Sequence, residues 1–324
     1  MKKLVKIAAV LLAVGIILIA AGLFRAHKDN VSASSIYGAI EDNLKLGESN
    51  VAYTPPERFD FGSMKNLTTK GRFESELNEF NTLELYAEGC EVTVSVTDSD
   101  MMTASGSDCT LVTGISGGTL HIEAVNDEGS GELAINMPDS YKGGCVINAE
   151  SCDISLDSFE SAMDVSFNIR GSKLRSNALS ADNISVMTNN SEFSAADMNA
   201  VENIRIDGES SEFDIKKLTA RSTGFTVNNT TASLSDINGA ITTNARMSAL
   251  KLGFSRITGN IGIDATGSNA DVTLPENANI TLRHKESYGM FRDKTKSAQN
   301  DSANLGDAYT METNIKFGIV TAAN

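Results

Sequence analysis

The chain has 324 residues, and its 42 Asp and Glu residues outnumber its 27 Lys and Arg residues, which gives a formal net charge of −15 at pH 7. An acidic surface of this kind repels phosphate backbones, which argues against nucleic acid as a partner. Tryptophan is absent and proline occurs four times, while 41% of the residues are hydrophobic, a normal share for a folded protein. The composition is typical of a turn-rich β protein.

An apolar segment opens the chain. Residues 4–24 contain one charged residue, Lys6, and are sufficient to cross a bilayer core of about 30 Å. The lysines at the start of the chain favour a cytoplasmic end at residues 1–3 and an extracytoplasmic remainder. We therefore expect a retained transmembrane helix in the lipid bilayer and a single-pass cell-membrane location. A cleaved signal peptide ending near Ala21 is the alternative, but the segment is longer than the roughly 7–15-residue apolar core of such peptides.

Residues 25–78 are weakly patterned and contain Pro55-Pro56, so we expect a juxtamembrane stalk or linker there. A β domain is expected over residues 79–324. Period-two alternation predicts two opening strands around the Glu88-Gly89 turn, followed by less regular strands that cap the domain. The apolar residues of these strands are Leu83, Leu85, Val92, Val94, Val96, Leu120, Ile122, Leu133, Ile135 and Met137.

Between Cys145 and Asp271 a strand–turn–strand pattern repeats seven times, at an interval of about twenty residues. Each repeat has an apolar residue that we call the anchor: Ile154, Leu174, Phe193, Phe213, Leu234, Leu250 and Ala270. Such a period indicates a solenoid, because each unit is too small to bury its apolar face except by stacking. The predicted fold is all-β: a single-stranded β-helix or solenoid of about seven short rungs over residues 145–275, with β caps. An evenly spaced β-sandwich is the alternative.

Four further positions of the repeat carry a recognisable residue type. Positions nine and seven before the anchor are mostly β-branched or aromatic, which predicts inward-facing strand residues. The position two before the anchor is always small, which predicts a tight corner. An Asn or Asp usually stands six before the anchor, as in Asn148, Asn168 and Asn244, which predicts a turn and a possible amide ladder. The position one before the anchor is mostly polar and is expected to face solvent.

Beyond the repeat, two closing strands are predicted at residues 281–284 and 313–321, with a polar loop at 291–307 between them. The four cysteines, Cys90, Cys109, Cys145 and Cys152, show no metal-ligand spacing. Cys145 and Cys152 both occupy inward positions of the first rung. Buried thiols and a disulfide between these two residues are both compatible with that placement, and an extracytoplasmic location would permit the disulfide.

No arrangement of residues in the sequence indicates catalysis, metal binding or cofactor binding. The three histidines, His27, His121 and His284, form no triad motif, and His121 is expected to face solvent from a strand. Glu192 and Glu212 are the best carboxylate pair, about 5 Å apart on adjacent rungs. They could serve retaining glycoside chemistry, but a solvated charge ladder with Lys173 explains them more simply. Asp98-Ser99-Asp100 and Asn126-Asp127-Glu128 lack the spacing of a calcium loop and are better explained as turns.

The order of these segments resembles the bacterial DUF4097 family of adhesin-like proteins. The resemblance rests on the strands Phe80–Leu85 and Glu91–Val94, on Leu133–Pro138 leading into short repeats, and on Asp271–Pro275 followed by a strand and Gly289. Family members often carry Gly where this chain has the small Ser or Cys position. The resemblance implies a β-solenoid of the bacterial envelope, and it brings no catalytic residues.

Two functions are compatible with this reading, and neither is enzymatic. One is an adhesin-like binding or scaffold module, whose solenoid presents repeated polar side chains to a protein or glycan. The other is an accessory of an envelope-stress sensing system that works through a membrane-protein partner. The cytoplasmic end of residues 1–3 is too short to transmit a signal by itself, which favours the binding module.

Overall fold

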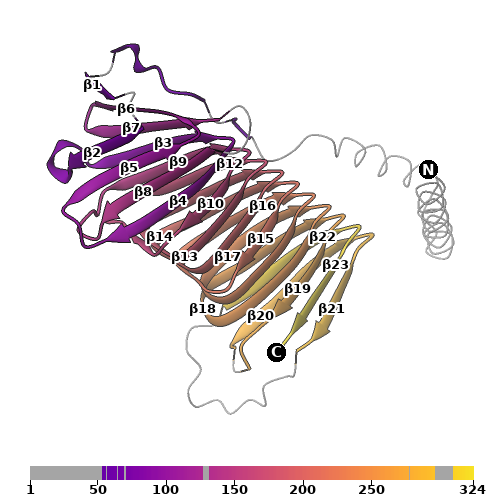
Figure 1. The fold of residues 1–324 in the computed structure, drawn as a ribbon. Coiled ribbons are helices and arrows are strands. Elements are labelled where there is room, and N and C mark those ends of the chain that lie inside the picture. The colour runs from indigo at the N-terminus through magenta and orange to yellow at the C-terminus, as the bar shows by residue number, and fades with distance from the viewer. Residues whose placement is uncertain are drawn as a thin grey trace, which may run out of the picture. The chain divides into compact units, whose positions relative to one another are not determined.

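The computed structural model describes residues 53–55, 57–63, 65–68, 71–126, 131–276, 278–295 and 309–324. The predicted transmembrane helix at residues 4–24 lies outside these ranges. Residues 50–324 form one compact unit, whose core is assembled from its own strands. Figure 1 shows these strands stacked side by side as the rungs of a solenoid. The all-β solenoid predicted from the repeat is confirmed.

The described residues form twenty-three strands and two short 3-10 turns. The turns are η2 (Phe61–Ser63) and η3 (Leu77–Glu79). The strands are β1 (Lys65–Thr68), β2 (Arg72–Glu76), β3 (Thr82–Glu88), β4 (Cys90–Thr97), β5 (Met101–Ser107), β6 (Thr110–Ser116), β7 (Thr119–Val125), β8 (Gly131–Pro138), β9 (Gly144–Glu150), β10 (Asp153–Leu156), β11 (Phe159–Glu160), β12 (Val165–Arg170), β13 (Lys173–Asn189), β14 (Glu192–Glu209), β15 (Glu212–Ile215), β16 (Leu218–Asn228), β17 (Thr231–Arg246), β18 (Ala249–Thr266), β19 (Asn269–Thr273), β20 (Ile280–Ser287), β21 (Met290–Lys294), β22 (Tyr309–Lys316) and β23 (Ile319–Ala323).

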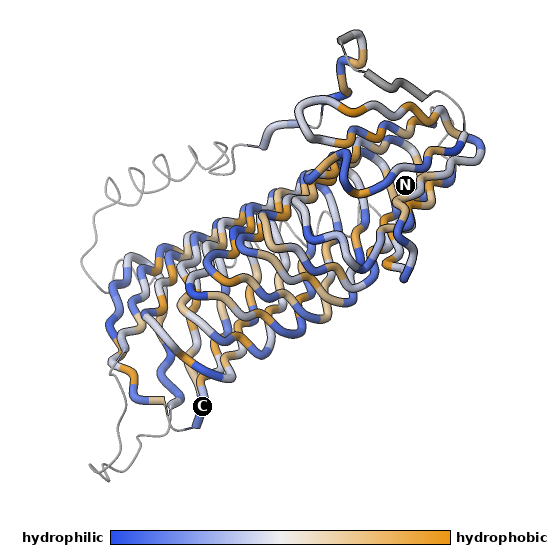
Figure 2. The backbone as a smooth tube through the Cα atoms, turned by 90° about the vertical axis from the view of Figure 1, so that its left-hand side faces the viewer, coloured by the Kyte–Doolittle hydropathy of each residue, from blue (hydrophilic) through white to orange (hydrophobic). Residues whose placement is uncertain are grey.

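Successive rungs pair in parallel, so that each residue of the repeat lies beside its counterpart in the next rung. Ile154 pairs with Leu174, Leu174 with Phe193, and Phe193 with Phe213. The residues nine and seven before these anchors are buried, and those one before are exposed, as predicted. Figure 2 shows the resulting alternation of hydrophobic and hydrophilic residues along the tube.

The register of the fifth rung differs from the prediction by two residues. Phe213 pairs with Ala232, and Ala232 pairs with Leu250, so the anchor of this rung is Ala232 and not Leu234. A shift of two residues keeps every side chain on the same face of a strand, and both candidates are buried, so hydrophobicity alone cannot tell them apart. The corrected register places Thr223 nine residues before the anchor and Thr230 at the small position.

The turn also lies elsewhere than predicted. The Asn or Asp six before the anchor is part of a strand, as Asn148 in β9 and Asn168 in β12 show. The chain turns three residues later, at a residue with positive φ: Ser151, Gly171, Asn190, Ser210, Asn229, Met247 and Gly267 in the seven rungs. We predicted an amide ladder at the position six before the anchor. Among the described residues, one side-chain hydrogen bond joins adjacent rungs at this position, from Asn314 Nδ2 to Asp264 Oδ2 at 3.4 Å.

The small position beside this turn forms a ladder of hydroxyl groups along the solenoid. Each hydroxyl donates to the carbonyl two residues before it and accepts the backbone N–H of the previous rung. Ser191, for example, donates to Asn189 O at 2.8 Å and accepts from Ser172 N at 3.2 Å. The ladder runs through Ser172, Ser191, Ser211, Thr230, Ser248 and Ser268. The predicted tight corner is confirmed, and these bonds explain why most of its residues are Ser or Thr.

The solenoid extends by two parallel rungs beyond the repeat at each end, and these rungs are out of chain order. At the N-terminal end β3 and β4 lie between β7–β8 and β9–β10. At the C-terminal end β22 and β23 lie between β18–β19 and the outermost strands β20–β21. Residues 291–294, which we predicted as the start of a polar loop, belong to strand β21.

The N-terminal end is capped by antiparallel strands. β6 pairs with β7 and β5 with β8, and the outermost strands β1 and β2 pair with β6 and β5. These caps cover strand edges that would otherwise be open to pairing with another chain. Strands β1 and β2 lie within residues 25–78, so the β structure begins before the boundary expected at residue 79, and the later part of the predicted stalk belongs to it.

One interior position predicts a stabilising substitution. Thr223 takes the place that Val165, Ile184, Ile204 and Ile261 hold in other rungs, and its hydroxyl is fully buried without a hydrogen-bond partner. We expect Thr223→Val to raise the free energy of unfolding by about 1 kcal/mol, because the cost of a buried unpaired hydroxyl is removed. Denaturant unfolding tests this, with the exposed Thr242→Val as control. A destabilised Thr223→Val would contradict the inward placement.

Candidate functional site

The charge ladder predicted around Glu192 is present on the outer surface of the middle rungs. Lys173, Glu192 and Glu212 lie in register on adjacent strands, and Lys173 Nζ lies 2.9 Å from Glu192 Oε1. Both side chains of this ion pair are about half exposed, at 48% and 52%. A glycosidase acid is kept protonated by burial, which this surface does not provide. The hollow beside the three residues has a volume of about 140 Å³. The arrangement is that of a solvated charge ladder.

This ladder predicts weak effects of substitution. We expect Glu192→Gln and Lys173→Gln each to change the free energy of unfolding by less than about 1 kcal/mol. The attraction between two solvent-exposed charges is weak, and it is offset by the entropy lost when two long side chains are held together. Denaturant unfolding in low and high salt measures the effect. A loss of several kcal/mol from either substitution would show that the pair is structural.

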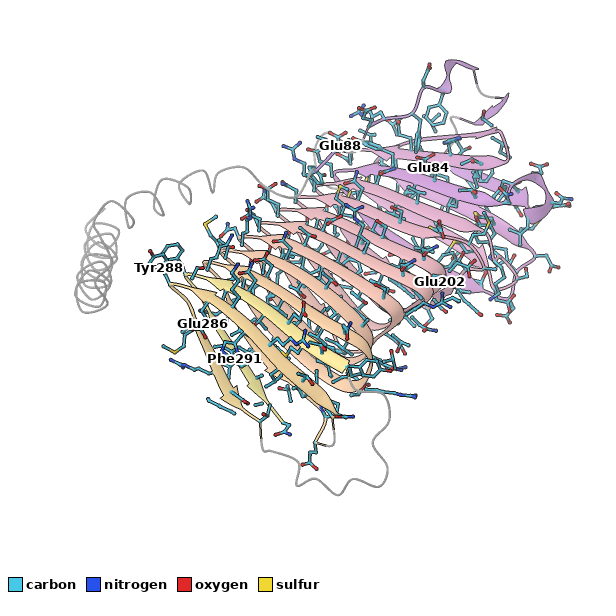
Figure 3. The ribbon with its side chains drawn as sticks, turned by 180° about the vertical axis from the view of Figure 1, so that it is seen from behind. Glu84, Glu88, Glu202, Glu286, Tyr288 and Phe291 are labelled. Carbon is cyan, nitrogen blue, oxygen red and sulfur yellow. The ribbon has the colours of Figure 1, made fainter. Side chains whose placement is uncertain are left out.

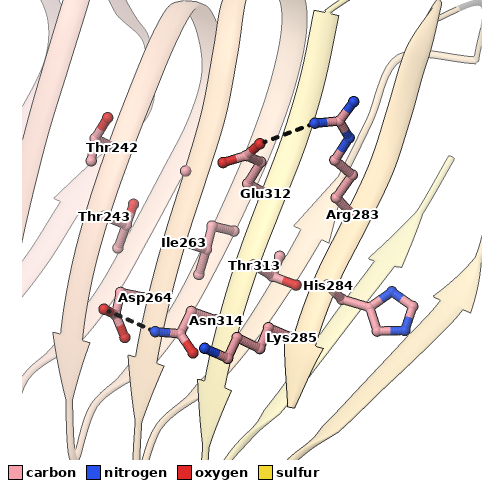
Figure 4. Close-up of a pocket in the computed structure, with 11 residues that line it drawn as sticks. Thr242, Thr243, Ile263, Asp264, Arg283, His284, Lys285, Glu312, Thr313 and Asn314 are labelled. Atoms are coloured by element: carbon pink, nitrogen blue, oxygen red, sulfur yellow. Dashed lines mark hydrogen bonds and ion pairs between the residues drawn. The ribbon is translucent and has the colours of Figure 1, made fainter.

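A larger groove crosses the outer surface of the C-terminal rungs (Figure 4). Its volume is about 460 Å³. One row of side chains runs through Thr242, Gly262, Glu312 and Arg283, which pair in register from β17 to β20. Gly262 adds no side chain to this row, and the hollow lies beside it. The groove is formed because four rungs place their outward residues side by side.

The second row of the groove is polar as well. Asp264, Asn314 and Lys285 follow one another across β18, β22 and β20, and Figure 4 shows them below the first row. Arg283 Nη1 lies 3.7 Å from Glu312 Oε1, and both side chains are about two-thirds exposed. Carboxylate, amide, ammonium and guanidinium groups are thus available to a polar ligand from one open surface.

The sequence reasoning missed this groove, although one signal was present. Eight residues before the anchor, an outward position, most rungs carry a polar side chain such as Ser166, Ser185 or Arg205. Two rungs carry a glycine there, Gly224 and Gly262, and of these two Gly262 lines the groove. A glycine in an outward column marks a place where another molecule can approach the backbone. The groove also needs β22, which enters the stack out of chain order and could not be aligned from the repeat.

Of the other residues singled out by the sequence, His284 lines the groove, whereas His121 and Asp98-Ser99-Asp100 line neither site. His121 is not solvent-facing as predicted: its side chain is 14% exposed, its ring packs against Phe59 at a centroid distance of 5.0 Å, and its Nδ1 lies 3.2 Å from Glu84 Oε2. Asp98-Ser99-Asp100 forms the turn between β4 and β5, where Ser99 Oγ accepts the Met101 N–H at 3.0 Å. No group of three metal-ligating side chains occurs within the described ranges.

All four cysteines carry free thiols. Cys90 and Cys152 occupy the corner position in neighbouring rungs, where each Sγ takes the place of a ladder hydroxyl and donates to a backbone carbonyl, of Glu88 and Glu150 respectively. Burial raises the pKa of Cys90 and of Cys145 to about 12 and that of Cys152 to about 11. These thiols are protonated at neutral pH and are poor nucleophiles.

No helix of the described residues is long and apolar enough to span a bilayer. No curated protein matches the chain. Among solved structures, a candidate adhesin from Parabacteroides distasonis shares 10% identity and a TM-score of 0.40, with 81% of this chain and 98% of that chain covered. A candidate adhesin from Bacteroides fragilis shares 10% identity and a TM-score of 0.32, with 80% and 97% covered.

A candidate lipid-binding protein from Parabacteroides distasonis shares 12% identity and a TM-score of 0.39, with 79% of this chain and 96% of that chain covered. The Toastrack DUF4097 family model matches residues 74–316 of the chain. These residues include nearly all of the described strands. The parallel rungs, the paired caps and this match together give one conclusion: the chain belongs to the Toastrack DUF4097 family.

Proposed function

We propose that the chain is a non-enzymatic, adhesin-like binding module of the bacterial cell envelope, held at the membrane by residues 4–24 with its β domain outside the cell. The groove over the C-terminal rungs is the observation that carries this proposal. Its walls offer charged and amide groups on a stack of hydrogen-bonded strands, so that a ligand meets a preformed surface. An extended polar chain, such as an envelope glycan or a peptide, fits an open groove lined by polar groups better than a small molecule does.

Support for a non-enzymatic role comes from the state of the candidate reactive groups. The Glu192 and Glu212 pair is solvated and Lys173 neutralises one carboxylate, while the buried cysteines are protonated and lie under the surface. A nucleophile needs an adjacent base and an approach path for its substrate. The family and the described residues suggest binding without turnover.

The groove can be tested by filling it. A Cβ added at Gly262 would meet its nearest neighbour, Thr242 Cγ2, at 3.6 Å, which is ordinary contact, so Gly262→Gln is expected to fold normally. We expect Gly262→Gln to weaken binding of residues 50–324 to isolated cell-wall glycan at least tenfold. Gly224→Gln is the matched control, because Gly224 lies in the same outward row two rungs away and has nothing within 4 Å of its added Cβ. Equal binding by both variants would contradict the groove.

Crosslinking in intact cells then identifies the class of partner. Capture of glycan or of a surface protein through a photoreactive residue in place of Lys285, which lines the groove and already carries a long side chain, supports the binding module. Capture of an integral membrane protein of a signalling system, together with loss of its stress response on deletion of the chain, would assign the accessory role in place of adhesion.

A further inference from the structure

The corner turn of each rung carries a residue with positive φ, and its identity changes along the solenoid. In the middle rungs it is Ser, Gly or Asn, residues that tolerate this conformation. In the last rungs bulky side chains take the position: Met247 with φ 46°, Phe317 with φ 53° and Tyr288 with φ 59°. A left-handed conformation is rare for bulky residues and costs energy. The turn alone therefore does not explain why Met, Phe and Tyr stand at these three positions.

These three side chains form one ridge, which we call the corner ridge. Arg246, Thr266, Lys316 and Ser287 pair in register across the last rungs, so the residues that follow them, Met247, Gly267, Phe317 and Tyr288, come in this order along the corner. The rings of Phe317 and Tyr288 are stacked, with centroids 5.2 Å apart and planes 10° from parallel. Phe317 and Tyr288 thus form a stacked aromatic pair, and Met247 lies at the same corner two rungs from Phe317, with Gly267 between them.

The corner ridge projects into solvent. Met247 is 47% exposed, Phe317 41% and Tyr288 53%, and these are three of the five large hydrophobic residues that are exposed in the described chain. Figure 3 shows Tyr288 pointing away from the last rungs at the end of the solenoid. A convex ridge cannot enclose a small ligand, because its side chains offer no walls. Its side chains can instead insert into a deformable surface.

Basic residues adjoin the ridge on an otherwise acidic protein, and one of them, Arg283, is ion-paired with Glu312 of the neighbouring strand. Arg246 and Lys316 directly precede Met247 and Phe317, and the outermost strands β20 and β21 add four basic residues against two acidic ones. The basic residues are Arg283, Lys285, Arg292 and Lys294, and the acidic ones are Glu286 and Asp293. Aromatic side chains flanked by Lys and Arg are the combination that partitions into the interface of an anionic bilayer.

We propose that the corner ridge of Met247, Phe317 and Tyr288 docks on an anionic lipid bilayer, with the neighbouring basic residues at the level of the headgroups. Three inserted side chains give weak binding by themselves. A membrane tether at residues 4–24, which is part of the proposed function, would raise the local concentration of the bilayer and make this docking effective. The ridge itself can be measured without the tether.

The absence of tryptophan from the chain provides a clean probe. Phe317→Trp in residues 50–324, which contain the whole described core, places a single indole in the ridge. Vesicles of phosphatidylcholine with 30% phosphatidylglycerol are expected to shift its emission to the blue, and lipids with a spin label in the acyl chain are expected to quench it. We expect binding to be at least tenfold tighter than to pure phosphatidylcholine and to weaken with salt. Val201→Trp, at a residue 63% exposed, is the control and should not shift.

The triple variant Met247→Asn, Phe317→Asn, Tyr288→Asn separates docking from folding. Asn holds the same position with positive φ at Asn190 and Asn229, so this variant should melt at the same temperature as the parent chain or higher, while vesicle flotation is lost. Unchanged flotation of the triple variant, or absence of a blue shift in Phe317→Trp, would overturn the proposal. Binding of the ridge to a polysaccharide in place of vesicles would also overturn it. Gly262→Gln should leave flotation unchanged, so that failure of the groove and failure of the ridge are distinguishable.

Discussion

Phe213→Asp should remove most of the stability of the middle rungs. Phe213 is 1% exposed, and its ring lies between those of Phe193 and Phe225, at centroid distances of 6.2 and 5.7 Å. A Cβ on Gly208 would lie 2.5 Å from Phe213 Cε2, so the glycine makes room for the ring. Loss of a buried Phe costs about 3–5 kcal/mol, and an unpaired buried carboxylate adds several more. We expect a total loss of at least about 5 kcal/mol, which is comparable to the stability of a whole domain.

The loss of stability caused by Phe213→Asp should be localised to the rungs around β15. Because each rung contacts only its neighbours, disruption at β15 is expected to spread through β14 to β17 and to decay toward the ends. Limited proteolysis with mass spectrometry should find new cleavage between residues 190 and 250 before the N-terminal cap is cut. Val201→Asp, an apolar-to-charged change at an exposed position, should have little effect. An unfolding free energy for Phe213→Asp within 1 kcal/mol of the parent chain would refute the stacked core.

The repeat predicted the solenoid because its signal is carried by many residues at once. Inward positions such as Ile147 and Phe167 recur at one interval, and burial of both was confirmed. The sequence determines the register of a single rung less well than it determines the repeat as a whole. Leu234 and Ala232 are both apolar, and the period of two in a strand gives both the same face. The pairings of Ala232 with Phe213 and with Leu250 resolve the choice.

The ends of the solenoid could not be aligned from the sequence for a different reason. A repeat predicts that consecutive rungs are neighbours, whereas β22 and β23 are inserted between β18–β19 and β20–β21. The groove and the corner ridge both depend on this insertion, because Glu312 and Phe317 reach their places only through it. The pairs Tyr288-Gly289 and Phe317-Gly318 are the local signal for the ridge, since both place an aromatic residue before the glycine of a corner. Gly318 and Gly289 continue the small position where the hydroxyl ladder ends.

Alkaline pH should destabilise the protein steeply, and three buried thiols should contribute a large part of the effect. Cys90, Cys145 and Cys152 are 2–4% exposed, and burial raises their pKa values to about 12, 12 and 11. In the unfolded chain a thiol has a pKa of about 8.5. Above that value the unfolded state loses protons that the folded state keeps, so the free energy of unfolding falls as the pH rises. The fall continues until the folded thiols ionise near pH 11–12.

Each thiol contributes up to about 1.4 kcal/mol per pH unit, so the three together should remove roughly 5–8 kcal/mol between pH 8.5 and 10.5. The repeat itself supplies the control, because other rungs place Ser at the positions of Cys90 and Cys152 and Val165 at that of Cys145. The triple variant Cys90→Ser, Cys145→Val, Cys152→Ser should therefore fold and keep more of its stability at pH 10.5 than the parent chain, in urea unfolding under a reductant. The difference between the two chains isolates the thiols from lysine and tyrosine residues, which titrate in both. Parallel pH profiles would mean that the thiols ionise equally in the folded and unfolded states, and the corner position would then be open to solvent rather than sealed by its ladder.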